Sequence, residues 1–326
     1  MAGSGSAHLR GEPMLLRVEN LVVEHGAGAE RVHAVSDVSF DLRRGETLGL
    51  VGESGCGKST LARAVLQLFR PKAGRVRFDG VDVAQQGGEA LRRLRRRMQL
   101  IFQDPIASLN PRRRIGDIVA EPLVIAGMGD AAERRRRARG ALTAVGLDAD
   151  LVMRRRPHEF SGGQCQRIAI ARSLVLEPDL VICDEPVSSL DVSIRAQILN
   201  LLEEMKRRYG LTLLFIAHDL AVVKAVSDRV AVMYLGKLCE IGPAEEVFAR
   251  PKHPYTAVLL AALPVPDPDA SLPESAIVGE PPSPLAPPNG CRFRTRCPLA
   301  RPRCTAEEPM MREIRAGHFV ACHFAD

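Results

Sequence analysis

The sequence predicts an α/β protein with a parallel sheet beside a phosphate-binding loop. Three observations predict this fold: a glycine-rich loop between an apolar run and a helical run, two later apolar runs separated by a helix, and short alternating runs ahead of the loop. Residues 180–184 and 211–217 flank a helical pattern over 193–208, which makes a βαβ unit with parallel strands. The short runs between residues 14 and 40 predict antiparallel strands.

The glycine-rich loop reads Gly52-Glu53-Ser54-Gly55-Cys56-Gly57-Lys58-Ser59 and fits the pattern G-x-x-x-x-G-K-[S/T]. It follows the apolar run 47–51 and opens the helical run 60–69. In that context backbone N–H groups curl around phosphate oxygens, and the helix N-terminus adds its positive dipole end. We expect Lys58 to reach the β- and γ-phosphates and the Ser59 hydroxyl to bind Mg²⁺. The sequence therefore predicts a site for a nucleoside triphosphate.

The bulk composition is that of a globular protein, with 46% apolar and 26% charged residues in 326. No apolar run reaches the ~18 residues that a membrane span needs. Residues 1–10 lack the apolar core of a signal peptide, and residues 1–13 have the composition of a disordered tail. We expect a cytosolic chain that sits on a membrane only through a partner.

The net charge is +6, and many arginines come in runs. These runs are 92–93, 95–97, 112–114, 134–137 and 154–156. One interpretation is a nucleic-acid surface; the other is a set of solvated helix faces, close to anionic lipid. We favour the second, because the runs lie on separate predicted elements and the chain has no Trp and only three Tyr for base stacking. No direct nucleic-acid partner is expected.

The other elements follow from local patterns in chain order. They are a strand over 74–78 with a tight turn at Asp79-Gly80, an arginine-rich helix or loop over 89–97, a short strand ending at Gln103, a helical stretch from 115 to 151, a helix after Ser161 that runs through 176, short strands over 227–242 with a turn at Gly236, and a linker rich in Pro and Gly over 264–290.

Four polar residues stand at the ends of predicted strands. Asp184 closes an apolar strand and Glu185 follows it, so one carboxylate is placed to hold Mg²⁺ and the next to polarise water. His218 and Gln103 end two further strands. Each residue alone has a structural explanation, but together with the phosphate-binding loop they predict one site.

Ser161-Gly162-Gly163-Gln164 is a second anion-binding element at the start of a helix. One chain rarely needs two such loops for one nucleotide. We therefore expect a dimer in which this loop caps the nucleotide held by the other subunit.

In order and spacing, these motifs resemble those of the ATP-binding-cassette ATPases over residues 14–250. The set comprises the Walker A loop Gly52–Ser59, the Q-loop residue Gln103, the signature motif Ser161–Gln164, the Walker B pair Asp184-Glu185, the D-loop Ser188-Ser-Leu-Asp191 and the H-loop residue His218. The resemblance implies a RecA-like P-loop core with an antiparallel β subdomain and a helical subdomain at about 104–176. It also implies bound ATP and Mg²⁺, with the metal held by Ser59, Gln103 and Asp184, Glu185 as general base and His218 as γ-phosphate sensor.

The same resemblance adds Thr60 to the nucleotide-binding residues and places Gln103 between the site and a transmembrane partner. The family usually stacks an aromatic residue on adenine; near that place this chain has His25. Longer strings narrow the resemblance to the ATPases of dipeptide and oligopeptide importers. These strings are 102–112, 116–122, 191–197, His253-Pro-Tyr-Thr256 and Gly279-Glu-Pro-Pro-Ser-Pro284.

That resemblance implies a peptide-importer subunit on the cytoplasmic face of the inner membrane. Its partners would be a second ATPase, either a paralogue or a copy of itself, two transmembrane permeases and an extracytoplasmic substrate-binding protein. Nickel and glutathione importers belong to the same subfamily, so those substrates stay open. The alternatives from other classes are a soluble cassette ATPase acting on nucleic acid or ribosomes, and a catalytically dead regulatory partner.

Eight cysteines in a cytosolic chain do not predict a disulfide framework. Cys56, Cys165, Cys183 and Cys239 are dispersed through the predicted core, whereas the other four cluster at the end, in the predicted C-terminal domain 251–326. The four are Cys291, Cys297, Cys304 and Cys322. Their spacing is not a Cys-x2-Cys zinc pattern, yet four thiolates can bind an iron–sulfur cluster or Zn²⁺. The tail resembles that of the peptide-importer relatives, some of which hold a [4Fe-4S] cluster there, and we take such a cluster as the hypothesis, with zinc second and free thiols as the alternative.

Overall fold

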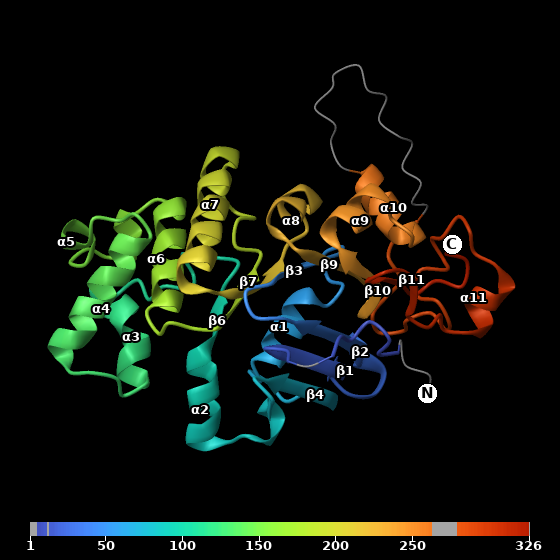
Figure 1. The fold of residues 1–326 in the computed structure, drawn as a ribbon, viewed down its shortest axis with the longest axis horizontal. Helices are drawn as coiled ribbons and strands as arrows, with labels where there is room; N and C mark the ends of the chain where they lie inside the picture. The colour runs from blue at the N-terminus through green and yellow to red at the C-terminus, as the bar shows by residue number, and fades with distance from the viewer. Residues whose placement is uncertain (1–4, 12, 263–278, 326) are drawn as a thin grey trace, which may run out of the picture. The chain divides into compact units, whose positions relative to one another are not determined.

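A computed structural model describes residues 5–11, 13–262 and 279–325 of the chain (Figure 1). The chain divides into two compact units. The first comprises Met1–Arg43, Thr47–Gln85 and Ala217–Asp326, and the second comprises Arg44–Glu46 and Gln86–Ile216.

The first unit contains an antiparallel sheet with strand order β2-β1-β4-β5. Its strands are β1 (Leu16–His25), β2 (Val32–Leu42), β4 (Ala73–Phe78) and β5 (Val81–Asp82), with short 3-10 turns at Gly28–Glu30 and Val83–Gln85. Along β1, Leu16, Val18, Leu21 and Val23 are buried and their neighbours are more exposed, which gives the sheet one apolar face. The antiparallel strands predicted before the loop are thereby confirmed.

The first unit also carries the strand order β11-β12-β10-β9-β3, in which β3 and β9 are parallel and the other pairs antiparallel. These strands are β3 (Thr47–Val51), β9 (Arg229–Tyr234), β10 (Lys237–Pro243), β11 (Arg312–Arg315) and β12 (His318–Val320). The helices of this unit are α1 (Lys58–Val65), α8 (Leu220–Val226), α9 (Ala244–Ala249), α10 (Pro254–Ala261) and α11 (Pro302–Ala306). Helix α1 packs against β1 and β2.

The second unit contains three parallel strands in the order β8-β7-β6. They are β6 (Met98–Ile101), β7 (Leu180–Asp184) and β8 (Thr212–Ile216). All five residues of β7 and of β8 are buried, as expected for strands covered on both faces. Helix α7 (Val192–Tyr209) connects them, so the predicted βαβ unit is confirmed.

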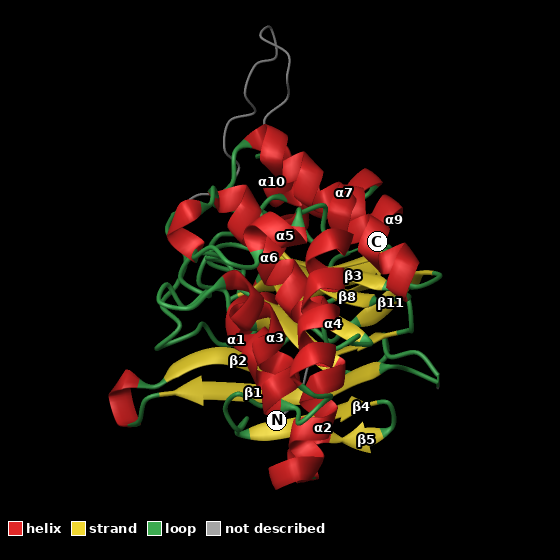
Figure 2. Cartoon of the chain, turned by 90° about the vertical axis from the view of Figure 1, so that its left-hand side faces the viewer, coloured by secondary structure: helices red, strands yellow, loops and turns green. Residues whose placement is uncertain are grey.

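The other helices of the second unit are α2 (Gly88–Arg97), α3 (Ile115–Ile125), α4 (Ala131–Ala144), α5 (Ala149–Val152) and α6 (Gly162–Leu174), with a 3-10 turn at Pro157–Glu159. Helices α3, α4 and α6 contact one another and form a helical group, seen as three neighbouring coils in Figure 2. The arginine-rich stretch predicted as helix or loop is the helix α2.

The predicted disordered tail is wrong for residues 5–11. His8 is buried and its Nε2 lies 2.6 Å from the Ser39 carbonyl oxygen. Arg10 pairs with the fully buried Asp41 carboxylate at 2.7 Å. Polar partners on β2 therefore order a segment whose own composition gave no such signal. Residues 1–4 and 12 lie outside the described part of the chain.

The predicted linker is described only in part. Residues 264–278 lie outside the described residues, and 279–290 form a loop in which the Pro284 carbonyl accepts a hydrogen bond from the His33 N–H at 3.0 Å. Among the described residues, no helix has both the length and the apolar character that a membrane crossing needs.

Candidate functional site

The glycine-rich loop joins β3 to α1 in the first unit, as the sequence predicts. The Lys58 side chain is buried, and its ammonium nitrogen donates to the carbonyl oxygens of Gly52 at 2.8 Å and Glu53 at 3.0 Å. The loop thus folds around the ammonium group of its own lysine. Cys56 is buried beside it; burial raises the pKa of the Cys56 thiol, and the nearby Lys58 charge opposes that rise.

Two glycines of the loop have no room for a side chain. A Cβ at Gly52, whose φ is +154°, would lie 2.1 Å from the Met233 carbonyl oxygen. A Cβ at Gly57, whose φ is +109°, would lie 2.0 Å from the Ala34 carbonyl oxygen. The loop therefore depends on glycine both for its backbone angles and for its close approach to β2 and β9.

Gln103 and Glu185 are brought together in the second unit. The Gln103 side-chain amide donates to Glu185 Oε2 at 3.0 Å. Glu185 has a left-handed backbone with φ of 49°, and its N–H donates to the Ile216 carbonyl oxygen at 2.9 Å. A non-glycine residue held in this region costs free energy and is found most often at functional sites.

Asp184 precedes Glu185 and ends β7 with its side chain buried. The neighbouring thiol of Cys183 is fully buried, and burial raises its pKa to about 12. Ser59, Gln103 and Asp184 offer a hydroxyl, an amide carbonyl and a carboxylate. All three groups can bind a metal ion through oxygen, which suits Mg²⁺. Ser59 belongs to the first unit, and Gln103 and Asp184 belong to the second.

His218 and His25 both lie in the first unit with exposed side chains. His218 stands immediately before Asp219, whose side chain caps α8 by accepting from the N–H groups of Ala221 and Val222. His25 ends β1, and its ring packs edge-on against Phe69 with centroids 5.3 Å apart. The Phe69 contact supports the His25 ring at an exposed strand end.

The second predicted anion-binding element forms the N-terminus of α6. Ser161 is the N-cap, its hydroxyl accepting from the Gln164 N–H and its own N–H donating to the Gln164 side chain. A Cβ at Gly163 would lie 2.5 Å from Cγ2 of Ile194 on α7, so this turn is closely packed. The capping residues are exposed, which leaves the helix end open to solvent.

The four C-terminal cysteines line one small cavity together with His253, Phe293 and His323. The pKa of Cys291 is raised to about 11, mainly by burial and to a smaller extent by the nearby thiols of Cys304, Cys322 and Cys297. The four cysteines that cluster in the sequence therefore also lie at one cavity. Within the described ranges, however, no three or more His, Cys, Asp or Glu residues are placed to hold a metal ion. The other four cysteines are buried, as predicted.

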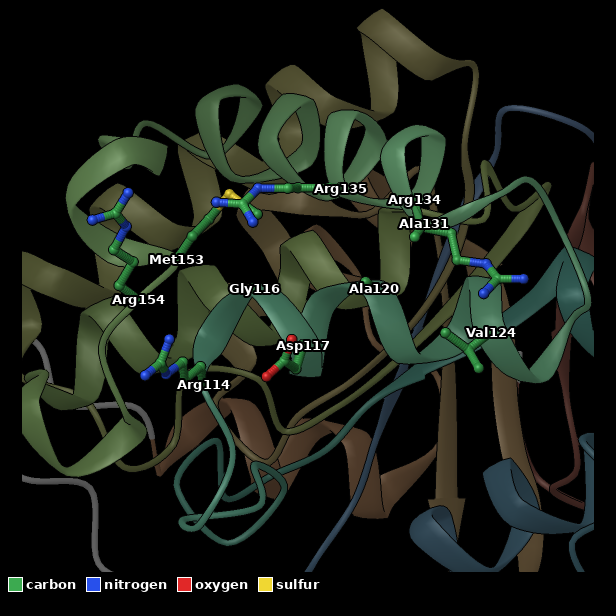
Figure 3. A pocket seen from close by; sticks show the side chains of 10 residues that line it. All are labelled: Arg114, Gly116, Asp117, Ala120, Val124, Ala131, Arg134, Arg135, Met153 and Arg154. Atoms are coloured by element: carbon green, nitrogen blue, oxygen red, sulfur yellow. The ribbon is translucent and has the colours of Figure 1, made fainter.

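Residues of three arginine runs, on separate elements and with Arg114, Arg135 and Arg154 exposed, line one groove of about 840 Å³ in the second unit. The groove residues are Arg114, Gly116, Asp117, Ala120, Val124, Ala131, Arg134, Arg135, Met153 and Arg154. In Figure 3, Arg114, Arg135 and Arg154 lie around Met153 at one end, whereas Arg134 points toward Val124 at the other. Arg134 donates to the Met128 carbonyl oxygen at 2.9 Å.

Two residues that contact the glycine-rich loop were not singled out from the sequence. Tyr255 Oη accepts from the Glu53 N–H at 2.9 Å, and Arg296 donates to the Glu53 carboxylate at 2.9 Å. Tyr255 lies in the string His253-Pro-Tyr-Thr256, which carried the family resemblance but no assigned role. Arg296 precedes Cys297, and only that proximity to a singled-out cysteine could have drawn attention to it.

The fold and these motifs define an ATP-binding-cassette ATPase, and comparisons with known proteins agree. The family model described as ABC transporter matches residues 35–188, and the model described as oligopeptide/dipeptide transporter, C-terminal region, matches residues 239–304. The chain belongs to the ABC transporter family, within the group that carries this C-terminal region. It is an ATPase with the fold of an ABC cassette.

Individual relatives cover most of the chain. A putative peptide import ATP-binding protein of Brucella ovis is 54% identical over 95% of this chain and 98% of its own length. The oligopeptide transport ATP-binding protein OppF of Haemophilus influenzae is 52% identical over 91% of this chain and 90% of its own.

Solved structures match the cassette part of the chain. The cassette MJ0796, bound to ADP and Pi in a post-hydrolysis state, aligns with a TM-score of 0.64 and 28% identity, covering 70% of this chain and 98% of that one. Clostridium perfringens cbiO1, part of the ABC transporter complex cbiONQ, aligns with a TM-score of 0.65 and 31% identity, covering 73% and 92%.

Proposed function

We propose that this chain is the ATP-hydrolysing subunit of an importer that drives di- or oligopeptides across the cytoplasmic membrane. The observation that carries the proposal is its 54% identity, over 98% of the relative's length, to a protein named for peptide import. The separate match to the oligopeptide/dipeptide transporter C-terminal region supports it. We assign the cassette to residues 14–250, with its helical subdomain at about 104–176, and a C-terminal domain to 251–326.

The glycine-rich loop is the proposed site of the ATP phosphates, with Lys58 as their main cationic partner. Ser59, Gln103 and Asp184 would hold Mg²⁺, which supplies charge neutralisation on the transferred phosphoryl group. Lys58 donates to loop carbonyl oxygens, so its ammonium group must exchange those bonds for phosphate oxygens when ATP binds. Residues Gly52 to Thr60 and His25 complete the nucleotide contacts in this proposal.

Glu185 is the proposed general base that accepts a proton from the attacking water. Its backbone is fixed by the Ile216 carbonyl and its carboxylate by Gln103, which favours one orientation of the acceptor oxygen. His218 is the proposed partner of the γ-phosphate.

The exposed N-terminus of α6 supports a head-to-tail dimer of cassettes. Ser161 to Gln164 would cap the nucleotide bound by a second ATPase, either a copy or a paralogue. Gly163 lies close to Ile194 of α7, so a side chain at this position would displace the capping turn from α7. The remaining proposed partners are two transmembrane permeases and an extracytoplasmic substrate-binding protein, with this chain peripheral on the cytoplasmic face of the membrane.

The arginine-lined groove is the proposed docking surface for an acidic helical segment of a permease. Within the described residues, the guanidinium groups of Arg114, Arg135 and Arg154 have no hydrogen bond or ion pair. Ala120, Val124 and Met153 give the groove apolar surface, so an amphipathic segment with carboxylates fits its chemistry. Ten residues separate Gln103 from Arg114 along the chain, which gives the docked segment a short route to the site.

For the C-terminal cysteines we propose a [4Fe-4S] cluster, with zinc as the alternative. The convergence of four thiols on one cavity supports it, although they must draw together further to act as ligands. The test is iron, sulfide and zinc analysis of anaerobically purified protein, beside a variant in which Cys297 and Cys304 are Ser. Iron and a broad absorption band near ~400 nm would support the cluster; a metal-free wild type would exclude both metals.

Purification from native membranes tests the transport function. Two multi-span proteins, with or without a second cassette ATPase, should co-purify with the wild type and be depleted when Arg114, Arg135 and Arg154 are replaced by Glu. Uptake of a labelled tripeptide should be lost on deletion and return with the wild type but not with Glu185→Gln. Ribosomal proteins or DNA-repair factors in place of membrane proteins would overturn the proposal. If the transporter takes up nickel or glutathione and no peptide, the proposed peptide substrate is wrong and the importer type stands.

A further inference from the structure

One residue of the glycine-rich loop, Glu53, is held at three atoms. Its N–H donates to Tyr255 Oη at 2.9 Å, and its carboxylate accepts from Arg296 Nη1 at 2.9 Å. Its carbonyl oxygen accepts from Lys58 Nζ at 3.0 Å. The first two partners come from the C-terminal part of the chain, and all four residues lie within the first unit. The loop therefore owes part of its conformation to groups about 200 and 240 residues away along the chain.

The two C-terminal partners are themselves fixed. The Arg296 side chain is only 7% exposed in its ion pair with Glu53, and its Nη1 also lies 3.3 Å from Tyr234 Oη. The rings of Tyr234, Tyr255 and Phe293 pack together, with centroids between 4.6 and 5.3 Å apart. Burial lowers the pKa of Arg296, but its hydrogen bonds to Glu53 and Tyr234 outweigh burial and leave that pKa raised. Burial raises the pKa of Tyr255, so its hydroxyl stays neutral.

A second layer ties these partners to the end of the chain. Tyr255 is the second residue of α10, and its N–H donates to Nδ1 of the capping residue His253 at 3.1 Å. The N–H of His253 donates to the buried Glu240 carboxylate at 2.9 Å. The same carboxylate lies 2.7 Å from Nε2 of His318 on β12. Strand β12, helix α10 and the loop are thus joined by consecutive polar contacts.

We propose that Arg296 and Tyr255 are positioning residues for the phosphate-binding loop, through which the C-terminal domain sets the affinity of the chain for Mg·ATP. A loop that binds phosphates through its backbone N–H groups binds more tightly when it is held in the bound conformation beforehand. Arg296 fixes the Glu53 side chain and Tyr255 fixes the Glu53 backbone. Neither touches phosphate itself. The inference rests on the proposed assignment of this loop to ATP.

The test compares Mg·ATP affinity by calorimetry and the steady-state kcat and KM of ATP hydrolysis in full-length variants. For Arg296→Gln and for Tyr255→Phe we expect the Kd and KM for Mg·ATP to rise about tenfold, because each removes one hydrogen bond, in the Arg296 case to a charged group. The kcat should change by less than about twofold, since the groups that act in the transition state are intact. Arg296→Lys should recover part of the affinity. Arg294→Gln is the matched control, because within the described residues the Arg294 side chain donates to the nearby Asn289 carbonyl and not to the loop.

A double-mutant cycle separates positioning from general destabilisation. Glu53→Gln should weaken Mg·ATP binding about as much as Arg296→Gln, and the double variant should be little weaker than either, because the two changes remove one contact. Tyr255→Phe deletes a single oxygen and preserves the aromatic packing. This variant therefore still tests the positioning role if Arg296→Gln does not fold. Additive losses in the cycle, or wild-type affinity in Tyr255→Phe, would overturn the proposal.

Lys58→Ala distinguishes this inference from the site assignment. If Lys58→Ala still binds Mg·ATP normally, the loop is not the ATP site and both statements fail. If Lys58→Ala loses binding while Arg296→Gln and Tyr255→Phe bind as the wild type does, the positioning role alone fails.

Discussion

The side-chain amide of Gln103 lies 3.0 Å from the carboxylate of Glu185, so the residue proposed to sense a membrane partner directly orients the proposed general base. Gln103 leads into the chain segment that reaches the arginine-lined groove. Displacement of that segment would change the orientation of the carboxylate, which gives a physical route from docking to hydrolysis within the second unit.

Replacing Glu185 by Gln should lower kcat for ATP hydrolysis by about 10²–10⁴-fold, because an amide cannot accept the proton from water. Mg·ATP should still bind, since the phosphate-binding loop is untouched. Phosphate release and calorimetry on the same preparation measure the two effects. Gln103→Ala, which removes only the hydrogen bond that orients Glu185, should lower kcat less than Glu185→Gln does. A Glu185→Gln enzyme within twofold of wild type would contradict the role of Glu185.

Replacing Gly163 by Ala should destabilise the packing of α6 on α7 and reduce ATP hydrolysis. The new Cβ would lie 2.5 Å from Ile194 Cγ2, a branch at Cβ whose χ1 rotation is restricted in a helix. Such overpacking costs about 1–3 kcal/mol. The double change with Ile194→Ala removes the clashing atom and should recover both stability and activity relative to Gly163→Ala. Denaturant unfolding and phosphate release check it, and a double variant no better than the single would refute the contact.

His253 should make the protein less stable below neutral pH. Burial lowers its pKa from the ordinary 6.5 to about 4, partly opposed by Glu240. The unfolded chain therefore takes up a proton as pH falls through 6.5, whereas the folded chain does not until about pH 4. Stability that is complete above pH 6.5 is lost across this window, by an amount on the order of 3 kcal/mol.

His253→Asn tests this pH dependence. An Asn side-chain oxygen still caps α10 but does not titrate, so unfolding of the variant should depend less on pH between 6.5 and 4. His158→Asn, at an exposed position, should leave the wild-type slope unchanged. Equal slopes for wild type and His253→Asn would show that other groups govern acid unfolding.

Removing the Arg10 side chain charge should lower the free energy of unfolding by about 1–3 kcal/mol at neutral pH, because the buried Asp41 carboxylate loses one of its two arginine partners. Burial raises the pKa of Asp41, but Arg10 and Arg229 outweigh it and hold that pKa below 3.8. The stability that the ionised Asp41 carboxylate contributes is thus complete above its unfolded-state pKa of 3.8. This stability is lost as pH falls through the lower pKa of the folded state. Urea titration of Arg10→Gln measures it, and Arg112→Gln is an exposed control.

Local patterns were sufficient for β3, the glycine-rich loop and the βαβ unit, because their periodicity and glycine spacing are confined to short stretches. Helix α1 ends at Val65 rather than at residue 69, since Gln67 takes a left-handed backbone with φ of 53° that no local residue signals. Partners distant in sequence were not predictable. Arg296 and Glu53 are 243 positions apart, and nothing in either neighbourhood specifies the other.

The arginine runs also show that local patterns do not predict which distant segments come together. Each run alone has the pattern of a solvated face, and the folded chain places Arg114, Arg135 and Arg154 at one groove. That these three line one groove could not be predicted from any single run. The four C-terminal cysteines were rightly grouped, because they are close in sequence as well as in space.

The chain has three tyrosines and no tryptophan, and two of the three, Tyr234 and Tyr255, share the aromatic cluster behind the glycine-rich loop. The intrinsic ultraviolet emission of the unlabelled protein therefore comes largely from groups bonded to Glu53 and Arg296. A change in that emission on adding a non-absorbing phosphate compound would report a change in the glycine-rich loop. The third tyrosine, Tyr209 at the end of α7, can be replaced by Phe to leave a reporter of that cluster alone.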